Sequence, residues 1–226
     1  MFHIFIDLEM NEVLNREGTN KCKNEVIQIG AIKLDEKLKK VDTFNIYIKP
    51  KENKILDKIE KLTGISNEKV KDAIYFNEAM DLFLDWIGED FKIYAWSGND
   101  YLQLKYESKY KNYTNPKLKI MLKRWKDFQR EFCKLLDLDK GYQISLDMAL
   151  NIVDIKFKGN RHNALDDAIN TSILFKITRN KDKFKSEYSY IKETLCLKKK
   201  EPFCTFGDFL TEDILKCFGG EGEDEA

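Results

Sequence analysis

The chain has 226 residues, enough for one full-sized domain with a substantial core and a smaller appendage. Hydrophobic residues make up 42% and charged residues 35%. The N-terminus lacks the basic-then-apolar profile of a signal peptide, and no apolar run approaches the length of a membrane span. The 39 basic and 39 acidic residues balance, so any attraction for nucleic acid must come from local patches.

Five cysteines are widely spaced and include no Cys-x-x-Cys pair; they are Cys22, Cys133, Cys196, Cys204 and Cys217. An odd number without paired spacing predicts reduced thiols and argues against a disulfide or zinc framework. We therefore expect a cytoplasmic protein with no membrane partner.

The first half of the chain predicts three strands and then a helical region. Residues 2–9, 25–35 and 41–48 are rich in strand-forming residues, and their short links predict an antiparallel meander that ends at Pro50. Residues 52–90 are expected to be helical. They contain a start signal at Ser66-Asn67-Glu68 and an apolar stripe made of Ala79, Leu82, Phe83 and Trp86.

The second half predicts strands that alternate with helices. Residues 92–96 form a short fourth strand, a helix follows from residue 101, and a fifth strand near 121–127 precedes an amphipathic helix that continues through Leu136. Further helices are expected at 145–153, with Ser145 as N-cap, and at about 163–178. Strands first, then strands alternating with helices, predict an α/β fold around a mixed sheet.

The apolar pattern weakens beyond residue 180. A charged segment at 198–202 and a short acidic tail at 219–226 cannot build a core. We therefore divide the chain into a domain at 1–179 and a C-terminal extension at 180–226.

Two carboxylates stand two positions apart at the end of the first strand. Residues i and i+2 of a strand share a face, so Asp7 and Glu9 point together, and a hard divalent cation such as Mg²⁺ or Mn²⁺ relieves their repulsion. The alternative is a pair of solvent-facing acids at a strand end. The apolar strand argues against it, because an unpaired buried carboxylate is costly.

Later polar residues also have the placement of site residues. Asp100 follows a strand-to-turn step, where open α/β sheets bind ligands, although a helix N-cap also explains it. His162 is one of two histidines and follows the glycine-bearing segment 159–161, although a surface loop position also explains it. On the next helix, Asp166 and Asp167 differ by about 100° in direction, so only one of them easily faces a site shared with His162.

Taken in order, these motifs resemble the DEDDh branch of the DnaQ-like 3′→5′ exonucleases. The motifs lie at residues 6–9 with 25–32, at 96–100 and at 162–168, and the family spacing selects Asp167. The resemblance covers residues 1 to about 179 and is nearest to the branch that trims RNA 3′ ends. It implies an RNase H-like α/β fold, a mixed five-stranded sheet flanked by helices.

The resemblance also implies a phosphodiester hydrolase that uses two metal ions. Asp7, Glu9, Asp100 and Asp167 would hold two Mg²⁺ or Mn²⁺ ions, and His162 would be the general base. Residues 62–65 are similar to the family segment that wedges against the terminal bases. The substrate-binding candidates are Met10, Leu62, Ile65, Trp96 and Asn99.

Residues 101–130 carry nine basic side chains against two acidic ones, interleaved with four tyrosines and Trp125. This mixture is suited to tracking phosphates and stacking bases, although solvated lysines around core aromatics also explain it. Residues 101–126 are longer and richer in lysine than the compact core of the family.

Three functions fit the sequence. The first is an exonuclease that acts on single-stranded 3′ ends, with RNA favoured over DNA, and releases 5′-mononucleotides. The second is a DNA proofreading or repair exonuclease. The third is a catalytically silent nucleic-acid-binding module, against which the complete set of four acids and a histidine argues. The sequence does not predict the oligomeric state.

Overall fold

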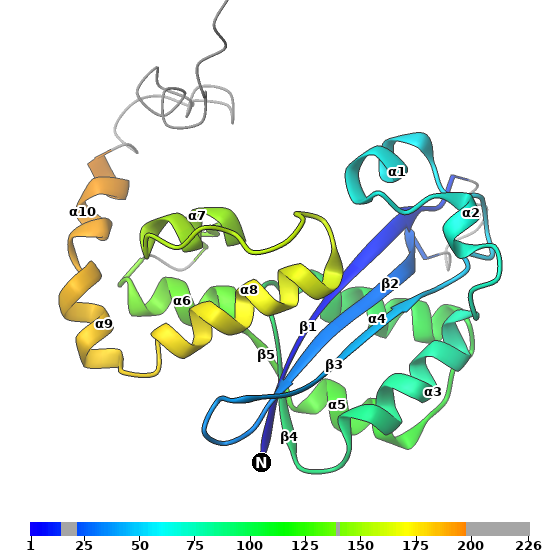
Figure 1. The fold of residues 1–226 in the computed structure, drawn as a ribbon, viewed down its shortest axis with the longest axis horizontal. Coiled ribbons are helices and arrows are strands. Elements are labelled where there is room, and N and C mark those ends of the chain that lie inside the picture. Colours follow the sequence, from blue (N-terminus) through cyan, green and yellow to red (C-terminus); the bar gives the residue numbers. More distant parts are fainter. Residues whose placement is uncertain (15–21, 139–140, 198–226) are drawn as a thin grey trace, which may run out of the picture. The chain divides into compact units, whose positions relative to one another are not determined.

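The computed structural model describes residues 1–14, 22–138 and 141–197 (Figure 1). The chain divides into two compact units, Met1–Tyr188 and Ser189–Ala226, and the one regular element described in the second is α10 (Tyr190–Leu197). The charged segment at 198–202 and the acidic tail at 219–226 lie outside the described residues. Within the described residues, every helix is too short or too polar to cross a lipid bilayer.

A mixed sheet forms the centre of the first unit and confirms the predicted five-stranded α/β fold. Its strands are β1 (Phe2–Glu12), β2 (Asn24–Leu34), β3 (Lys40–Tyr47), β4 (Phe91–Ala95) and β5 (Trp125–Asp127). The spatial order is β3-β2-β1-β4-β5. Strands β1 to β3 pair antiparallel as the predicted meander, β4 pairs in parallel with β1, and β5 pairs in parallel with β4.

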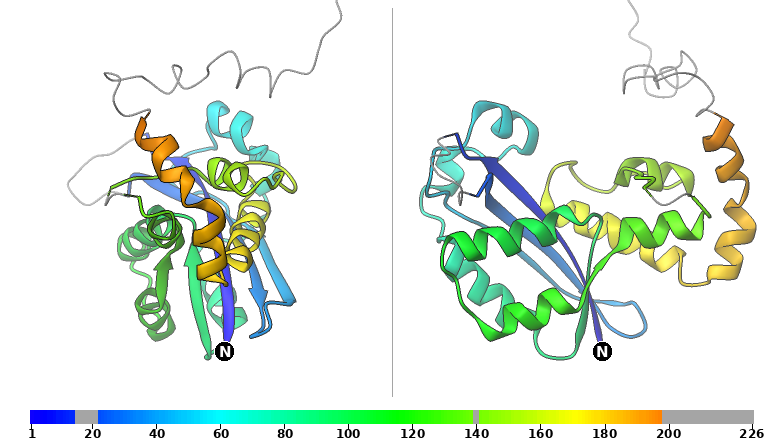
Figure 2. Two further views of the ribbon diagram at one scale, coloured as in Figure 1. Left: turned by 90° about the vertical axis from the view of Figure 1, so that its left-hand side faces the viewer. Right: turned by 180° about the vertical axis from the view of Figure 1, so that it is seen from behind.

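Helices cover both faces of this sheet (Figures 1 and 2). In chain order they are α1 (Asp57–Thr63), α2 (Asn67–Val70), α3 (Phe76–Ile87), α4 (Asn99–Tyr110), α5 (Pro116–Lys123), α6 (Phe128–Leu135), α7 (Leu146–Ile152), α8 (Ala164–Ile177) and α9 (Lys181–Tyr188). Helix α8 lies against β1 and β2 on one face. Helices α3, α4 and α5 close the main apolar core on the other.

The central strand β1 is buried on both faces, and its alternation decides where its acids point. Ile4, Ile6 and Leu8 belong to the core shared with α3, α4 and α5. Phe5 points to the opposite face, where its ring lies 5.0 Å from that of Phe175 on α8. Because alternate residues of a strand share a face, the α8 side also receives the side chain of Asp7 and, two residues later, that of Glu9.

Several element boundaries differ from the sequence expectations. Residues 52–90 form three helices separated by turns, and the first of them ends at Gly64, whose φ of 68° suits glycine. The fifth strand is limited to 125–127, because 121–123 continue α5. Leu82 is 48% exposed, so it lies outside the buried stripe of α3.

Helix α9 belongs to the first unit, which continues one helix beyond the predicted boundary at residue 179. Phe184 is buried, and its ring lies 5.5 Å from that of Phe132 on α6. A single apolar anchor in a polar helix produces little periodicity, which explains why the apolar sequence pattern weakens here. The assignment of 180–226 as an extension stays a prediction.

Candidate active site

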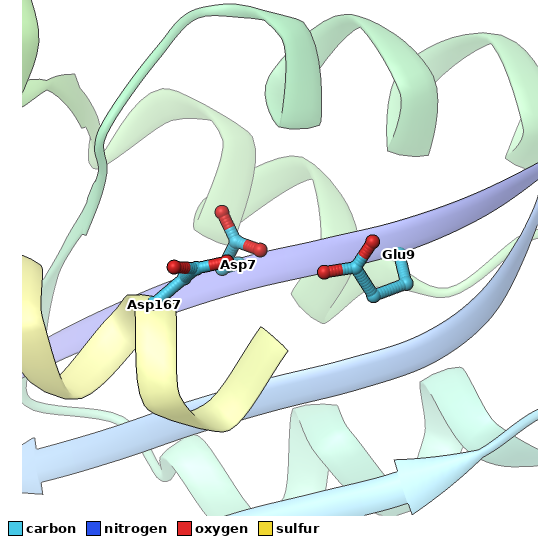
Figure 3. A group of neighbouring side chains, drawn as sticks. All are labelled: Asp7, Glu9 and Asp167. Carbon is cyan, nitrogen blue, oxygen red and sulfur yellow. The ribbon is translucent and has the colours of Figure 1, made fainter. Parts of the chain in front are cut away.

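Three carboxylates from two elements converge on the α8 face of the sheet (Figure 3). Asp7 and Glu9 project from β1, Asp167 projects from the first turn of α8, and one oxygen of each lies within 4.8 Å of the others. Glu9 is buried, and Asp7 and Asp167 are partly buried. The shared face expected from the spacing of Asp7 and Glu9 is therefore present, and they are not solvent-facing acids.

Asp100 adds a fourth acid from the first turn of α4, just after β4 ends. Its side chain is 5% exposed, and its charge raises the pKa of both Asp7 and Glu9, so it lies within electrostatic range of the other three. The N-cap of α4 is Gly98, which excludes the alternative that Asp100 caps the helix.

Burial raises the pKa of all four acids, and the charges of neighbouring acids raise each pKa further. Burial raises the pKa of Asp7 well above its ordinary value, and the charges of the other three acids raise it further. Burial, then Asp167 and Asp100, raise the pKa of Glu9 to about 8. Burial is also the main cause that raises the pKa of Asp100 and of Asp167 to about 7. Divalent cations would stabilise the ionised form of these four acids, which are therefore a suitable set of metal ligands.

The raised pKa values predict how the stability of the metal-free protein depends on pH. Because the pKa of Glu9 is about 8 and those of Asp100 and Asp167 are about 7, their ionisation destabilises the fold. Their contribution to the free energy of unfolding is greatest below the unfolded-state pKa of about 4, and it is lost progressively as pH rises from there to the folded-state pKa values of about 7 to 8. We expect the Tm measured in EDTA to fall between about pH 4 and about pH 8 and to level off above, and added Mg²⁺ to restore it.

The matched variant for this measurement is Asp167→Asn, which removes one of the repelling charges. Its Tm in EDTA should fall less steeply with pH than that of the wild type, since titrating groups elsewhere are common to both proteins. Equal slopes for the two proteins would contradict the proposed repulsion.

Gly30 allows the first turn of α8 to approach the sheet. It lies opposite Asp7 in the register of β1 and β2. A Cβ at this position would lie 2.0 Å from the backbone nitrogen of Leu165 and 2.2 Å from the carbonyl carbon of Ala164. Only a residue without a side chain fits, and the close approach brings Asp167 to the strand that carries Asp7.

Gln28 holds the same turn of α8 from the next inward-facing position of β2. It lies opposite Glu9 and is fully buried. Its side-chain oxygen accepts a hydrogen bond from the backbone N–H of Ala164 at 3.3 Å, and its amide group donates to Asn45 of β3 at 2.8 Å. The sequence motif at 25–32 includes Gln28 and Gly30, but no role was predicted for either residue. A polar residue and a glycine on the same face of an otherwise apolar strand are the pattern that could have indicated this role.

Gly30→Ala is expected to reduce any activity of the acid site by about 10²-fold, because the added methyl group forces α8 away and displaces Asp167. Overpacking should also lower the free energy of unfolding by about 1–3 kcal/mol. Turnover and urea denaturation of the same preparation would measure both effects. The wild type is the reference, and the denaturation curve shows whether the variant is folded at the assay temperature. Wild-type activity of a folded Gly30→Ala protein would contradict the positioning role of Gly30.

Asp166 is not a member of the acid group, and its side chain binds the segment 159–160 that precedes α8. Its carboxylate accepts a hydrogen bond from the backbone N–H of Asn160 at 2.8 Å. It also lies against Gly159, where a Cβ would be 2.3 Å from the Asp166 Cγ, and the φ of this glycine is 87°. The structure therefore groups Asp167, and not Asp166, with Asp7.

His162 lies at the exposed rim of the acid cluster. Its backbone N–H donates a hydrogen bond to the carboxylate of Asp167, and its φ of 59° is in the left-handed region. The preceding residue, Arg161, forms an ion pair with Asp147 of α7 at 2.7 Å. The backbone of His162 is thus fixed beside the site, and its side chain is exposed to solvent.

Three of the predicted substrate-binding residues have accessible side chains. Leu62 of α1 is 51% exposed, Asn99 is exposed at the start of α4, and Met10 is partly exposed next to Glu9. Their role in binding stays a prediction.

The other two predicted substrate-binding residues are buried. Ile65 is 1% exposed and packs with Ile27 and Val70. Trp96 is also buried, and its indole N–H donates to the carbonyl oxygen of Ile144 at 3.0 Å. The described contacts of both side chains lie within the fold, and a contact with substrate stays a prediction.

Comparison with known proteins agrees with this site. The sequence profile of the family described as Exonuclease matches residues 4–175. The chain belongs to this exonuclease family. Human ERI1 exoribonuclease 2 is 27% identical over 199 residues, a match that covers 77% of the chain and 28% of the human protein. The chain thus aligns with little more than a quarter of this relative.

Solved structures share the fold of this exonuclease-family chain. The nuclease domain of 3′hExo, a DEDDh family member bound to rAMP, has a TM-score of 0.68 at 20% identity, covering 78% of this chain and 90% of that domain. Pop2p of S. pombe, in a form with bound Mg²⁺ and Mn²⁺, has a TM-score of 0.57 at 17% identity, covering 78% of this chain and 82% of Pop2p. The predicted family is confirmed.

Proposed function

We propose that this chain is a 3′→5′ exonuclease that hydrolyses single-stranded nucleic acid to nucleoside 5′-monophosphates, with RNA preferred over DNA. The observation that carries the proposal is the convergence of Asp7, Glu9 and Asp167, with Asp100 in electrostatic range, in a chain of the exonuclease family. A pure binding module has no need of four repelling acids. The preference for RNA is supported by the human relative, which is named an exoribonuclease, and by 3′hExo, whose domain binds rAMP.

The acid cluster fits two divalent cations, with Mg²⁺ or Mn²⁺ as the expected ions. All four donors are carboxylates, whose hard oxygen atoms suit these ions, and four negative charges balance two of them. Among the described residues, the one group of side chains with metal-binding spacing is made of carboxylates alone, which disfavours zinc. When bound, the ions would lower the pKa of the attacking water and stabilise the charge on the leaving 3′-oxygen.

The remaining chemistry is assigned to the protein side chains. We assign His162 as the general base, because it borders Asp167 and because imidazole exchanges protons near neutral pH. We assign the exposed side chain of Leu62 to binding the terminal base, because an apolar side chain can pack against the face of a base. The four carboxylates would keep the scissile phosphate beside the base through the ions they hold.

The test is degradation of 5′-labelled single-stranded RNA and DNA of the same base sequence. We expect stepwise shortening from the 3′ end with Mg²⁺ or Mn²⁺, faster for RNA, and complete loss of activity in EDTA. A bulky group on the 3′ end should protect the strand. Full activity of metal-stripped protein, or internal cuts in a circular strand, would contradict the proposal, and faster cleavage of DNA would favour a proofreading or repair enzyme.

A further inference from the structure

A groove between α4 and α5 opens on a different side of α4 from the acid site. It has a volume of about 680 Å³ and includes Tyr101, which directly follows Asp100 in the sequence. Neighbouring residues of a helix point about 100° apart, so the turn that presents Asp100 to the acids presents Tyr101 to this groove. The groove and the acid site are therefore adjacent along one helix.

Three lysines border the groove, and no acidic residue lines it. Lys105 comes from α4, Lys119 and Lys123 come from α5, and all three are exposed. None of the three forms an ion pair with an acid in the described parts of the chain, whereas Lys117, also on α5, pairs with Asp85 at 2.7 Å. The groove therefore has an uncompensated positive rim.

The walls of the groove are apolar and partly aromatic. Leu118 and Tyr113 are almost fully buried at its base, and the hydroxyl of Tyr113 donates to Asp81 at 2.6 Å, which fixes the ring. Tyr101 is partly exposed, and its ring packs edge-to-face on Trp125 with centroids 6.0 Å apart. An aromatic face is thus held in place beside the lysines.

We propose that this groove binds single-stranded nucleic acid, upstream of the 3′ end that enters the acid site. An apolar groove with a fixed aromatic ring suits a nucleobase, and the lysine rim suits the phosphates on either side of it. A base would pack against Tyr101 and against Leu122, which also lines the groove, with its phosphates on Lys105, Lys119 and Lys123. The position of the groove relative to the strand rests on the proposed nuclease function, because that function defines which end enters the acid site.

The electrostatic test is a charge reversal of the rim in the full chain. The variant carries Lys105→Glu, Lys119→Glu and Lys123→Glu, and its matched control carries Lys37→Glu, Lys39→Glu and Lys40→Glu, three exposed lysines around the β2–β3 turn. Binding of a fluorescent single-stranded RNA is measured by anisotropy in EDTA over a series of salt concentrations. We expect the rim variant to bind RNA at least about tenfold more weakly than the wild type. The slope of log K against the logarithm of the salt concentration should decrease in magnitude by about 2, the value for three lost phosphate contacts on a single strand. The control should bind as the wild type does.

The stacking test uses Tyr101→Leu, which keeps an apolar side chain against Trp125 and removes the aromatic face. We expect RNA binding to weaken by about fivefold or more, with the salt slope unchanged. Melting curves of each variant verify that it is folded.

Equal binding by the rim variant and its control would overturn the proposal, and so would a wild type that binds an acidic peptide in place of RNA. The measurement needs no hydrolysis. Wild-type protein that binds RNA through the rim but cleaves nothing with Mn²⁺ would therefore overturn the proposed nuclease function and leave the groove as a binding site.

Discussion

Asp7→Asn is expected to abolish hydrolysis, with a loss on the order of 10³-fold or more in single-turnover rate. The substitution keeps the size of the side chain but removes one of the charges that a divalent cation needs. It should at the same time stabilise the metal-free protein at alkaline pH, because Asp7 is repelled by Asp100, Asp167 and Glu9. A variant that is inactive and yet melts at a higher temperature than the wild type in EDTA is the signature of a ligand, since a structural residue would lose both properties.

Two neighbouring acids on α8 provide the matched pair for this prediction. Asp167→Asn should share the loss of activity, because Asp167 lies with Asp7 and Glu9. Asp166→Asn should stay within about tenfold of the wild type, because the new side chain keeps an oxygen that accepts the N–H of Asn160. An active Asp167→Asn together with an inactive Asp166→Asn would show that Asp166, one residue earlier in the third motif, is the site acid.

The sequence could predict those parts of the site that depend on local geometry. Asp7 and Glu9 share a face because of the period of a strand, and that period holds whatever the strand packs against. Their convergence with Asp167 is different, because it joins segments 160 residues apart in the chain. No periodicity spans such a distance, so the choice of Asp167 depended on the resemblance to a family. The physical reason for the choice, Gly30 opposite Asp7, requires the strand register.

Motif membership alone did not reveal which way an apolar side chain points. Ile65 and Trp96 lie in segments that resemble the family, but both side chains are buried among other apolar groups. A hydrophobic residue in a motif fits a core and a substrate equally well. Leu62, from the same segment as Ile65, is 51% exposed, and Met10 is partly exposed.

Among the described residues, buried acids form two groups, and a neighbouring positive charge distinguishes one group from the other. Glu25 and Glu107 are fully buried, and burial raises the pKa of Glu107 to about 7. Lys111 lies 2.6 Å from Glu25 and 3.3 Å from Glu107, so this group has a counter-charge within the protein. Lys111 is one of the nine basic residues at 101–130 that were candidates for binding nucleic acid. In the structure it pairs with Glu25 and Glu107. Among the described residues, no lysine or arginine forms an ion pair with the four acids of the site, and Arg161, which lowers the pKa of Asp167, is paired with Asp147. These acids therefore suit a cation from solution.

His162→Asn should lower the hydrolysis rate by on the order of 10²–10⁴-fold, while the binding of metal and RNA persists. The φ of His162 is 59°, and asparagine tolerates this region better than most residues, so the substitution removes the imidazole and keeps the backbone that donates to Asp167. The pH–rate profile should change in the variant, because the side chain assigned to accept the proton of the attacking water is absent. RNA affinity measured in EDTA should stay within about threefold of the wild type, since His162 is assigned to proton transfer alone.

Chemical rescue separates a base from a merely structural residue at this position. His162→Gly also fits the positive φ and leaves the side-chain space to solvent, so added imidazole should restore part of the lost rate. Rescue should increase with the fraction of neutral imidazole, because only that form can accept a proton. The other histidine, His3, is buried in β1 against Phe175, and it cannot take over the role. Wild-type rate and pH profile in His162→Asn would remove the histidine from the mechanism and leave the acid site unchanged.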